Sequence, residues 1–417
     1  MSPGNTDRPV IRPRRSEREV IAYLAFMGIL LAFGIDASLP AFDQLREAFG
    51  LEPGSNQITL VVTLYFVGMA TGQLVYGPLS DRFGRTPTLL GGVGLYCLGA
   101  IGSILAPGIG WLFASRLLWG LGAAAPATMR TAVARDLYSG DQMARVISIM
   151  MGVFMAGPVL APVVGEAILQ IGSWRWVFGA ALGLAFVQVL WTLRFGETLD
   201  PAHRRPLEFR PVLAGFRSVF TTPITLRYTL ALTFSFGAFI SFLGSSQPVI
   251  DRIYGRGDSF ALWFGLGSVA MTVAFLSVNV FIKRYGAHQV AVFSATASVA
   301  ASGLLLIASF TANGVPAFGV WFALITLANA FTTLLTPTCY SLALAPMGDR
   351  AGTASGVVGF VTTAGGSALA AIVNSAIVAT VTPMALGYVV YGLAALVLLR
   401  WAARATTIDR VPQPAVA

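Results

Sequence analysis

Two ionisable side chains interrupt long apolar stretches of the sequence: a carboxylic acid, which can exchange a proton, and an arginine, which can change the pKa of a nearby acid. Asp36 lies in an apolar stretch near 20–42, and Arg116 lies in another near 110–134. Each is about six residues inside the outer end of its stretch, which is roughly 9 Å of helix. Charges at membrane depth are costly and usually face a cavity or a partner, so both are candidate functional residues. Their shared depth would allow them to pair.

The chemistry that such a pair offers is reversible protonation. Burial favours the neutral form of a carboxylate, and a nearby arginine favours the charged form, so an acid held between these influences can load and release a proton. The alternative is a structural role, in which Arg116 extends to the membrane interface while the shorter Asp36 cannot. Glu166, near the outer end of a stretch at 143–169, is a third candidate. A solvated or helix-capping role fits its position equally well.

Other polar residues within apolar stretches are predicted to hydrogen-bond between helices. They are Gln247, Asn279, Asn329 and Asn374. The cysteines, Cys97 and Cys339, and the histidines, His203 and His288, are dispersed along the chain. This dispersal predicts neither a disulfide framework nor a metal site.

The elements that must position these residues are transmembrane helices. The chain is 56% hydrophobic and only 11% charged, whereas a soluble domain carries about 25% charged residues. A helix needs about 20 apolar residues to cross a bilayer, and this rule predicts an all-α membrane protein with twelve spans. They lie near 20–42, 56–77, 88–106, 110–134, 143–169, 175–195, 225–250, 259–283, 289–310, 316–343, 351–380 and 383–402.

The basic residues predict the orientation of these spans. With the N-terminus in the cytoplasm, 22 of the 27 Lys and Arg face the cytoplasm, including Arg130 at the inner end of its span. Four face outward and only Arg116 is left within a span. This asymmetry follows the positive-inside rule, and it explains the net charge of +9 as membrane topology rather than nucleic-acid binding. The arginine-rich start resembles a signal peptide, but the apolar run after it is too long for one.

The sequence also predicts two pseudo-symmetric halves of six helices. Arg82-Phe83-Gly84 is echoed by Arg284-Tyr285-Gly286, and Gly140-Asp141 by Gly348-Asp349, at offsets of 202 and 208 positions. Similar offsets indicate a duplicated half, which transporters use for alternating access. The predicted segments are a cytoplasmic tail at 1–19, a first half at 20–195, a cytoplasmic linker at 196–224, a second half at 225–402 and a cytoplasmic tail at 403–417.

Several motifs resemble those of a known family. The segment from Gly72 to Arg85, GQLVYGPLSDRFGR, is similar to the signature of the major facilitator superfamily between its second and third spans. DASLP from Asp36, RLLWGLG from Arg116 and RDLY from Arg135 resemble motifs of the bicyclomycin/chloramphenicol (Bcr/CflA-type) drug:proton antiporters. The sequence departs from that pattern at Trp119, where the family has glutamine, and at Gly28, where no acid lies two turns before Asp36.

The resemblance implies the major facilitator fold and proton-driven export. Asp36 would bind protons or substrate, and Arg116 would couple to it. Asp81 would lie against the N-terminus of span eleven, near Arg350 and Ala351, where a helix favours an anion. The full cytoplasmic gate would comprise Gly77, Asp81, Arg82, Gly84, Arg85, Arg135 and Asp136, and the bend of antiporters would comprise Gly157, Pro158, Pro162 and Gly165.

The function that these patterns favour is efflux of small, largely apolar drugs or metabolites in exchange for protons. The alternatives are a proton-coupled uptake symporter for a nutrient and, from another class, a membrane receptor or enzyme, for which no catalytic constellation or large polar segment is visible. The expected partners are a small-molecule substrate, protons and lipid, with the proton gradient as energy source and no cofactor. We expect a single chain, with several spans, in a bacterial inner (plasma) membrane.

Overall fold

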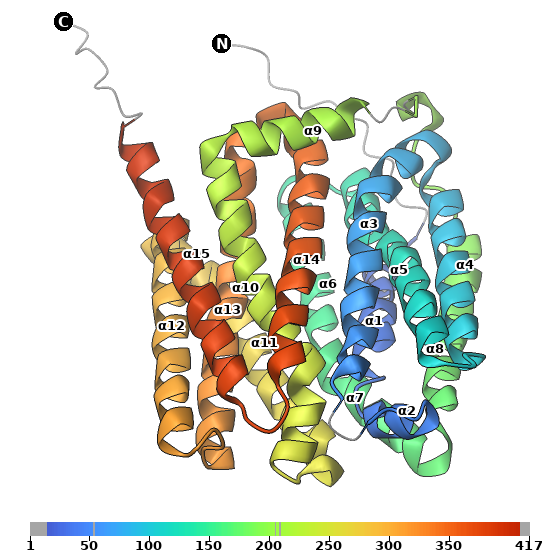
Figure 1. Cartoon of the computed structure of the whole chain (residues 1–417). Coiled ribbons are helices and arrows are strands. Elements are labelled where there is room, and N and C mark those ends of the chain that lie inside the picture. Colours follow the sequence, from blue (N-terminus) through green and yellow to red (C-terminus); the bar gives the residue numbers. More distant parts are fainter. Residues whose placement is uncertain (1–14, 53–54, 205, 208–209, 409–417) are drawn as a thin grey trace, which may run out of the picture.

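The computed structural model describes residues 15–52, 55–204, 206–207 and 210–408. Throughout these residues the regular structure is helical. Most of the helices run side by side from one end of a bundle to the other (Figure 1). The end of α15 (Thr382–Ile408) and the crossing helix α9 (Arg210–Thr221) lie at one end, and the short helix α2 (Phe42–Ala48) lies at the opposite end.

The two predicted halves each contain six spans. The first half consists of α1 (Glu17–Asp36), α3 (Leu60–Phe83), α4 (Arg85–Ile104), α5 (Ile109–Leu137), α6 (Gly140–Met155) continued by α7 (Gly157–Ile171), and α8 (Trp174–Phe195). The second consists of α10 (Pro223–Pro248), α11 (Phe260–Tyr285), α12 (Ala287–Thr311), α13 (Phe318–Leu344), α14 (Ala351–Ala376) and α15. The linker at 196–224 is partly helical, because α9 lies within it and packs on α14.

Eleven of the described helical segments are long and apolar enough to cross a membrane. The twelfth predicted span, α5, is not among them although it is 29 residues long. It carries Arg116 and Arg130 and several glycines, which lower its mean hydropathy. Because α3 and α4 pack along it, α5 meets protein rather than lipid over much of its length.

Close packing around α5 depends on glycine. A Cβ atom at Gly120 would lie 1.9 Å from the backbone oxygen of Tyr65, and one at Gly68 would lie 2.0 Å from that of Leu117. Both distances are far below van der Waals contact, so α3 and α5 approach backbone to backbone, as small residues allow between membrane helices. This close approach brings Tyr65 of α3 next to Arg116 of α5.

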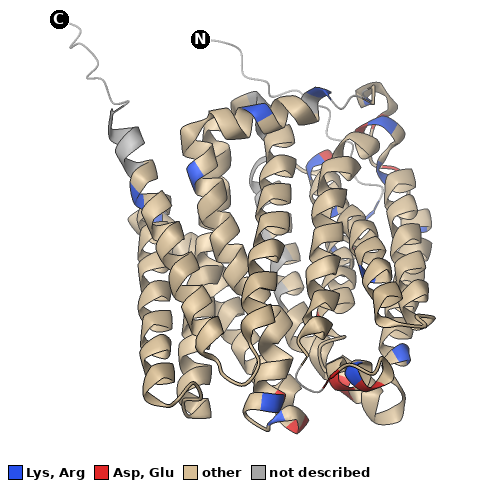
Figure 2. Cartoon of the chain, viewed as in Figure 1, with Lys and Arg blue, Asp and Glu red and all other residues tan. Residues whose placement is uncertain are grey.

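Charged residues lie mostly at the two ends of the bundle, and few lie between them (Figure 2). Several large apolar side chains are more than half exposed, which suits contact with lipid. They include Leu160, Leu193, Val280 and Val397. The assignment of Arg130 to the cytoplasmic surface is wrong. Its Nε and Nη1 atoms are buried within α5, and its guanidinium lies 4.7 Å from the ring centre of Phe154.

Candidate functional site

Arg116 lies in an aromatic cage between α3, α5 and α8. The residue is fully buried, and its guanidinium carbon is 4.9 Å from the ring centre of Tyr65 and 4.8 Å from that of Trp119. Phe178 lies slightly farther away, at 5.7 Å. Aromatic faces attract cations and replace part of the lost hydration. The cage therefore holds a charged group inside the bundle without a carboxylate partner.

The hydrogen-bonding capacity of Arg116 is largely unused. Its Nε donates to the backbone oxygen of Val61 at 3.2 Å. Its Nη1 and Nη2 are buried and have no hydrogen-bond partner among the described residues. A buried charge with free donors is costly in a structural role, so these donors are available to a further group, such as a ligand or an ionised carboxylate.

Asp36 is not paired with Arg116 in the described part of the chain. Its side chain is almost fully buried, and within the described part of the chain no ion pair joins these two residues. Tyr65 lies within electrostatic range of both, and its hydroxyl is buried without a described partner. Sequence reasoning missed Tyr65, because an aromatic residue in an apolar span carries no distinguishing signal.

Asp36 is the last residue of α1 rather than a residue inside a longer helix, which corrects the predicted span of 20–42. Pro40 disfavours helix in the residue before it. The chain therefore leaves α1 in tight turns, in which the backbone nitrogen of Leu39 donates to the oxygen of Asp36 and the Ser38 hydroxyl donates to the oxygen of Ile35. The site thus lies at a helix terminus.

The fifth span is interrupted where the sequence predicts a bend. Helix α6 ends at Met155 and α7 begins at Gly157, with Pro158 in the first turn of α7. A Cβ atom at Gly165 would lie only 2.2 Å from the backbone oxygen of Ala37, next to Asp36. Pro162 lies buried inside α7 between these positions. The predicted bend residues therefore place α7 directly against the segment that follows the candidate proton site.

Glu166 lies at the boundary between the two halves. Its carboxylate interacts electrostatically with the backbone of Ala261, in the first turn of α11. An anion at the N-terminus of a helix is stabilised by the free backbone N–H groups there. The position agrees with the capping alternative stated for Glu166, and the side chain is separate from the Arg116 cage.

The predicted cytoplasmic gate is centred on Arg85. Its Nε and Nη2 bind the two carboxylate oxygens of Asp136 at 2.8 and 3.2 Å, and its Nη1 binds Asp81 at 2.6 Å. Such two-pronged pairing is the strongest geometry between arginine and a carboxylate. Arg82 and Arg135 are exposed. The expected contact of Asp81 with Arg350 and Ala351 lies on residues whose side chains are outside the described set.

Glu197, from the linker, completes this gate and was missed by sequence reasoning. Its carboxylate oxygens accept hydrogen bonds from the backbone nitrogens of Arg85 at 2.8 Å and Thr86 at 3.2 Å, at the N-terminus of α4. The preceding Gly84 has φ +103°, and a Cβ atom there would lie 2.3 Å from Glu197 Oε2. Gly77 precedes this turn within α3 and has open space around it.

The other predicted polar residues have different outcomes. Asn329 accepts a hydrogen bond from the Tyr388 hydroxyl at 2.8 Å, and Asn374 accepts one from the Ser241 hydroxyl at 3.0 Å. The prediction is wrong for Asn279, which is exposed on α11 and makes no hydrogen bond to a described residue. Gln247 joins residues of both halves, as described below.

Comparisons with known proteins agree with this architecture. A sequence model of the Major Facilitator Superfamily matches residues 24–371. Over 371 residues the chain is 31% identical to a bicyclomycin resistance protein homolog of Haemophilus influenzae, covering 87% of this chain and 91% of that protein. It is 28% identical over 358 residues to the multidrug resistance protein MdtL of Escherichia fergusonii, covering 83% of this chain and 86% of that protein.

Solved structures show the same fold. A D-xylose–proton symporter superposes with a TM-score of 0.73 at 17% identity, over 93% of this chain and 97% of that chain. The human organic anion transporter MFSD10 (TETRAN) superposes with a TM-score of 0.67 at 18% identity, over 93% of this chain and 100% of that chain. These results confirm the predicted fold and indicate a transporter rather than an enzyme: the chain belongs to the Major Facilitator Superfamily.

Proposed function

We propose that the protein exports small, largely apolar molecules from the cytoplasm in exchange for protons, by alternating access. The observation that carries the proposal is that Asp36 and Arg116 are both buried, form no ion pair among the described residues, and both lie within electrostatic range of Tyr65. The names of the relatives, a bicyclomycin resistance protein homolog and a multidrug resistance protein, support the export of drugs. The bacterial inner membrane, with both termini in the cytoplasm, is the location that this function and the charge asymmetry favour.

In the proposed mechanism, Asp36 carries the proton. Protonated Asp36 is neutral and tolerates its dry surroundings, whereas ionised Asp36 needs water or a positive partner. When the bundle opens outward, Asp36 takes up a proton from the external medium. When it opens inward, binding of substrate and water favours release of that proton. The free Nη1 and Nη2 donors of Arg116 can then stabilise the ionised carboxylate, with the Tyr65 hydroxyl between them.

The test measures drug accumulation in an efflux-deficient bacterium, with and without an uncoupler. We expect the Asp36→Asn variant to lose export against a gradient, because an amide cannot exchange a proton. The matched control is Asp258→Asn, which alters an exposed acid in the outer loop before α11. If the Asp36→Asn protein exports the same drug uphill as fast as the parent, Asp36 does not couple transport to protons.

Uptake of a polar nutrient is the second candidate, since a D-xylose–proton symporter shares the fold. Binding a sugar requires several hydrogen-bonding side chains that face the substrate. In the second half, the side-chain oxygens of Asn329 and Asn374 already accept hydrogen bonds from Tyr388 and Ser241. This internal pairing favours the export of apolar molecules. Uncoupler-sensitive uptake of a sugar, in the same cells, would support the alternative.

A further inference from the structure

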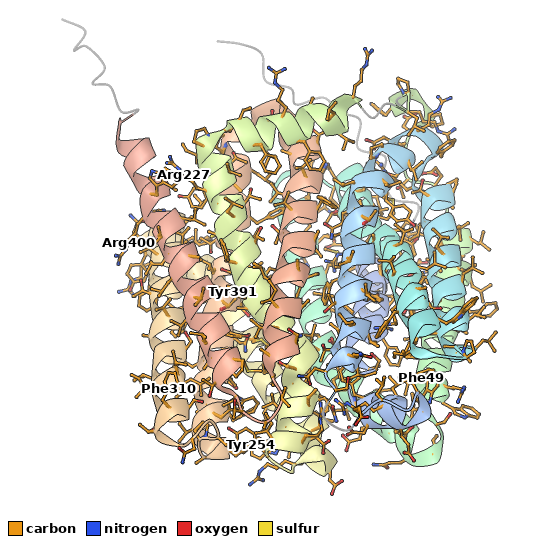
Figure 3. All side chains as sticks on the ribbon, viewed as in Figure 1. Phe49, Arg227, Tyr254, Phe310, Tyr391 and Arg400 are labelled. Atoms are coloured by element: carbon orange, nitrogen blue, oxygen red, sulfur yellow. The ribbon has the colours of Figure 1, made fainter. Side chains whose placement is uncertain are left out.

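A hydrogen-bonded network joins the two halves at the outer end of the bundle. From the first half it includes Asp43 and Arg46, both in α2. From the second half it includes Gln247 at the end of α10 and Asp251 in the π-helical turn Val249–Ile253. Figure 2 shows acidic and basic positions at the end of the bundle opposite α9, where α2 lies in Figure 1. In Figure 3, Phe49 and Tyr254, which follow α2 and that turn, lie at this end, opposite Arg227.

Gln247 is the centre of the network. Its Nε2 donates to Asp43 Oδ2 at 2.7 Å and to Asp251 Oδ2 at 3.3 Å, and its Oε1 accepts from Arg46 Nη2 at 3.4 Å. The side chain is only 2% exposed. An amide both donates and accepts hydrogen bonds, so one glutamine can bind an arginine and two carboxylates at once. An ionised carboxylate only accepts and an ammonium or guanidinium only donates, so no charged side chain has this combination.

Arg46 strengthens the connection from the side of the first half. It forms an ion pair with Asp43, and its side chain is almost fully buried. Burial and the nearby Arg252 lower the pKa of Arg46 to about 10, and Asp43 and Asp251 oppose that shift. Arg46 is therefore charged at neutral pH and lies among charges of both halves.

A second connection lies beside the first. Arg252 Nη2 donates to Asn56 Oδ1 at 3.2 Å, and the side-chain nitrogen of Asn56 donates to the backbone oxygen of Ile377, after α14. Asn56 belongs to the first half, and both of its partners belong to the second. The outer ends of the two halves are thus joined at two adjacent places.

A short, ordered connector links this network to Asp36. Only residues 37–41 separate α1 from α2, and their tight turns are held by bonds from Leu39 N to Asp36 O and from Ala41 N to Ser38 O, both 3.2 Å. Ala37, Leu39 and Ala41 are fully buried. A connector this short and this tightly packed transmits movement of Asp36 to α2 instead of absorbing it.

We propose that Gln247, with Asp43 and Arg46, is a latch that keeps the outer side closed, and that Asp36 releases it through the connector. Gln247 is then a positioning residue for transport and does not contact the substrate. The inference rests on the proposed function for its link to Asp36, but the closure itself requires neither drug nor proton gradient. The latch must break once in each transport cycle, because substrate leaves through this end.

The test compares two glutamine-to-glutamate changes of equal size. Gln247→Glu removes the donors of the amide and places a third carboxylate beside Asp43 and Asp251. Gln44→Glu is the matched control, because Gln44 is also in α2 but accepts a bond from the Trp174 nitrogen, within the first half. A carboxylate oxygen of glutamate can accept the same bond, so Gln44→Glu keeps this contact. A role limited to packing would make both substitutions harmless.

Opening is measured without substrate, by double electron–electron resonance in lipid nanodiscs. The spin labels replace exposed Glu47 and Asp258, on opposite halves, in a variant lacking Cys97 and Cys339. We expect Gln247→Glu to raise the ratio of open to closed molecules about tenfold or more, the effect of losing hydrogen bonds to charged groups. Gln44→Glu should leave the distances unchanged. Equal distances in the parent and Gln247→Glu would overturn the latch, whatever the outcome for export.

Transport supplies a second readout. Fewer inward-facing molecules raise the apparent KM for drug on the cytoplasmic side by the factor by which the inward-facing fraction falls. The maximal rate should change less, and Gln247→Leu, which adds no charge, should have a smaller effect than Gln247→Glu. A loss of maximal rate with unchanged KM in both variants would contradict the proposal.

Discussion

Replacement of Arg116 by leucine separates a functional charge from a structural one. The change removes three cation–π contacts, with Tyr65, Trp119 and Phe178, worth about 0.5–2 kcal/mol each. It also removes one charged hydrogen bond, worth about 1.5–3 kcal/mol. These losses are offset because the variant no longer buries a guanidinium, and removing a guanidinium from water costs several kcal/mol of folding free energy. The two contributions are similar in size, so we expect a change in the free energy of unfolding within about 1–2 kcal/mol, together with loss of energised export.

Two features make this near-balance plausible for the cage around Arg116. Val61 is in the first turn of α3, so its carbonyl oxygen can also accept a hydrogen bond within the helix. It is therefore not left without a partner when Arg116 is replaced. The space left by the guanidinium is lined by Tyr65, Trp119 and Phe178, which can close on a leucine.

The assay follows thermal unfolding through the reaction of a thiol-specific dye with Cys339, which is fully buried in the folded protein. Drug accumulation is measured on the same variants. Arg116→Lys serves as a comparison, because it keeps the charge and loses the planar guanidinium. If Arg116→Leu unfolds far below the parent temperature, or exports drug normally, the cage is structural and our reasoning about its free donors is wrong.

Three further predictions concern the bend and the cytoplasmic gate. Gly165→Val should lower the free energy of unfolding by at least about 1–3 kcal/mol, because its Cβ would lie 2.2 Å from the oxygen of Ala37. The control Gly179→Val, with no atom within 4 Å of its Cβ, should not. Equal melting temperatures of the two variants would contradict the close packing at Gly165. Asp81→Asn should slow turnover measured in vesicles but leave drug binding and stability nearly unchanged, since its carboxylate is about half exposed; unchanged turnover would count against a gating role. Glu197→Gln should cost about 1 kcal/mol of stability, as for a weakened helix cap, with the melting temperature as the measurement; a change as large as that of Gly165→Val would show that Glu197 does more than cap α4.

The sequence predicts the spans, their orientation and the two halves because lipid imposes a simple rule on helix length and charge. It predicts Asp36 and Arg116 because ionisable residues in apolar stretches are rare. It does not predict that α1 ends at Asp36, since the apolar composition continues past the helix end. Arg130 was misplaced for a related reason: position along a helix does not say whether a long side chain turns inward.

The outer network escaped sequence reasoning because its parts lie about 200 positions apart and are individually ordinary. In the sequence, Asp43 and Arg46 resemble a solvent-exposed pair between two spans. Gln247 is one polar residue among several in the spans. Only the packing of α2 against the end of α10 makes them a unit. The available signal was the buried amide of Gln247 itself, because a buried polar group requires partners.

The two departures from the resistance-exporter pattern have physical explanations in the bundle. Trp119 supplies an aromatic face for Arg116 and packs edge-on against Tyr96 and Phe178, so a glutamine hydrogen bond is replaced by cation–π contact. Gly28 packs tightly, because a Cβ atom there would lie 3.0 Å from Phe154 and 3.3 Å from Arg130 Nη1, so an acid would require both side chains to shift.

These two substitutions have a common consequence for coupling. An acid at position 28 would meet Arg130 and be held as an ion pair, and a glutamine at position 119 would occupy donors of Arg116. Without either, Asp36 is the one acid of α1 beyond its first turn, and Arg116 keeps two free donors. In the proposed mechanism, proton exchange is therefore concentrated on Asp36, and the connector to α2 would let that single carboxylate control whether the outer latch is closed.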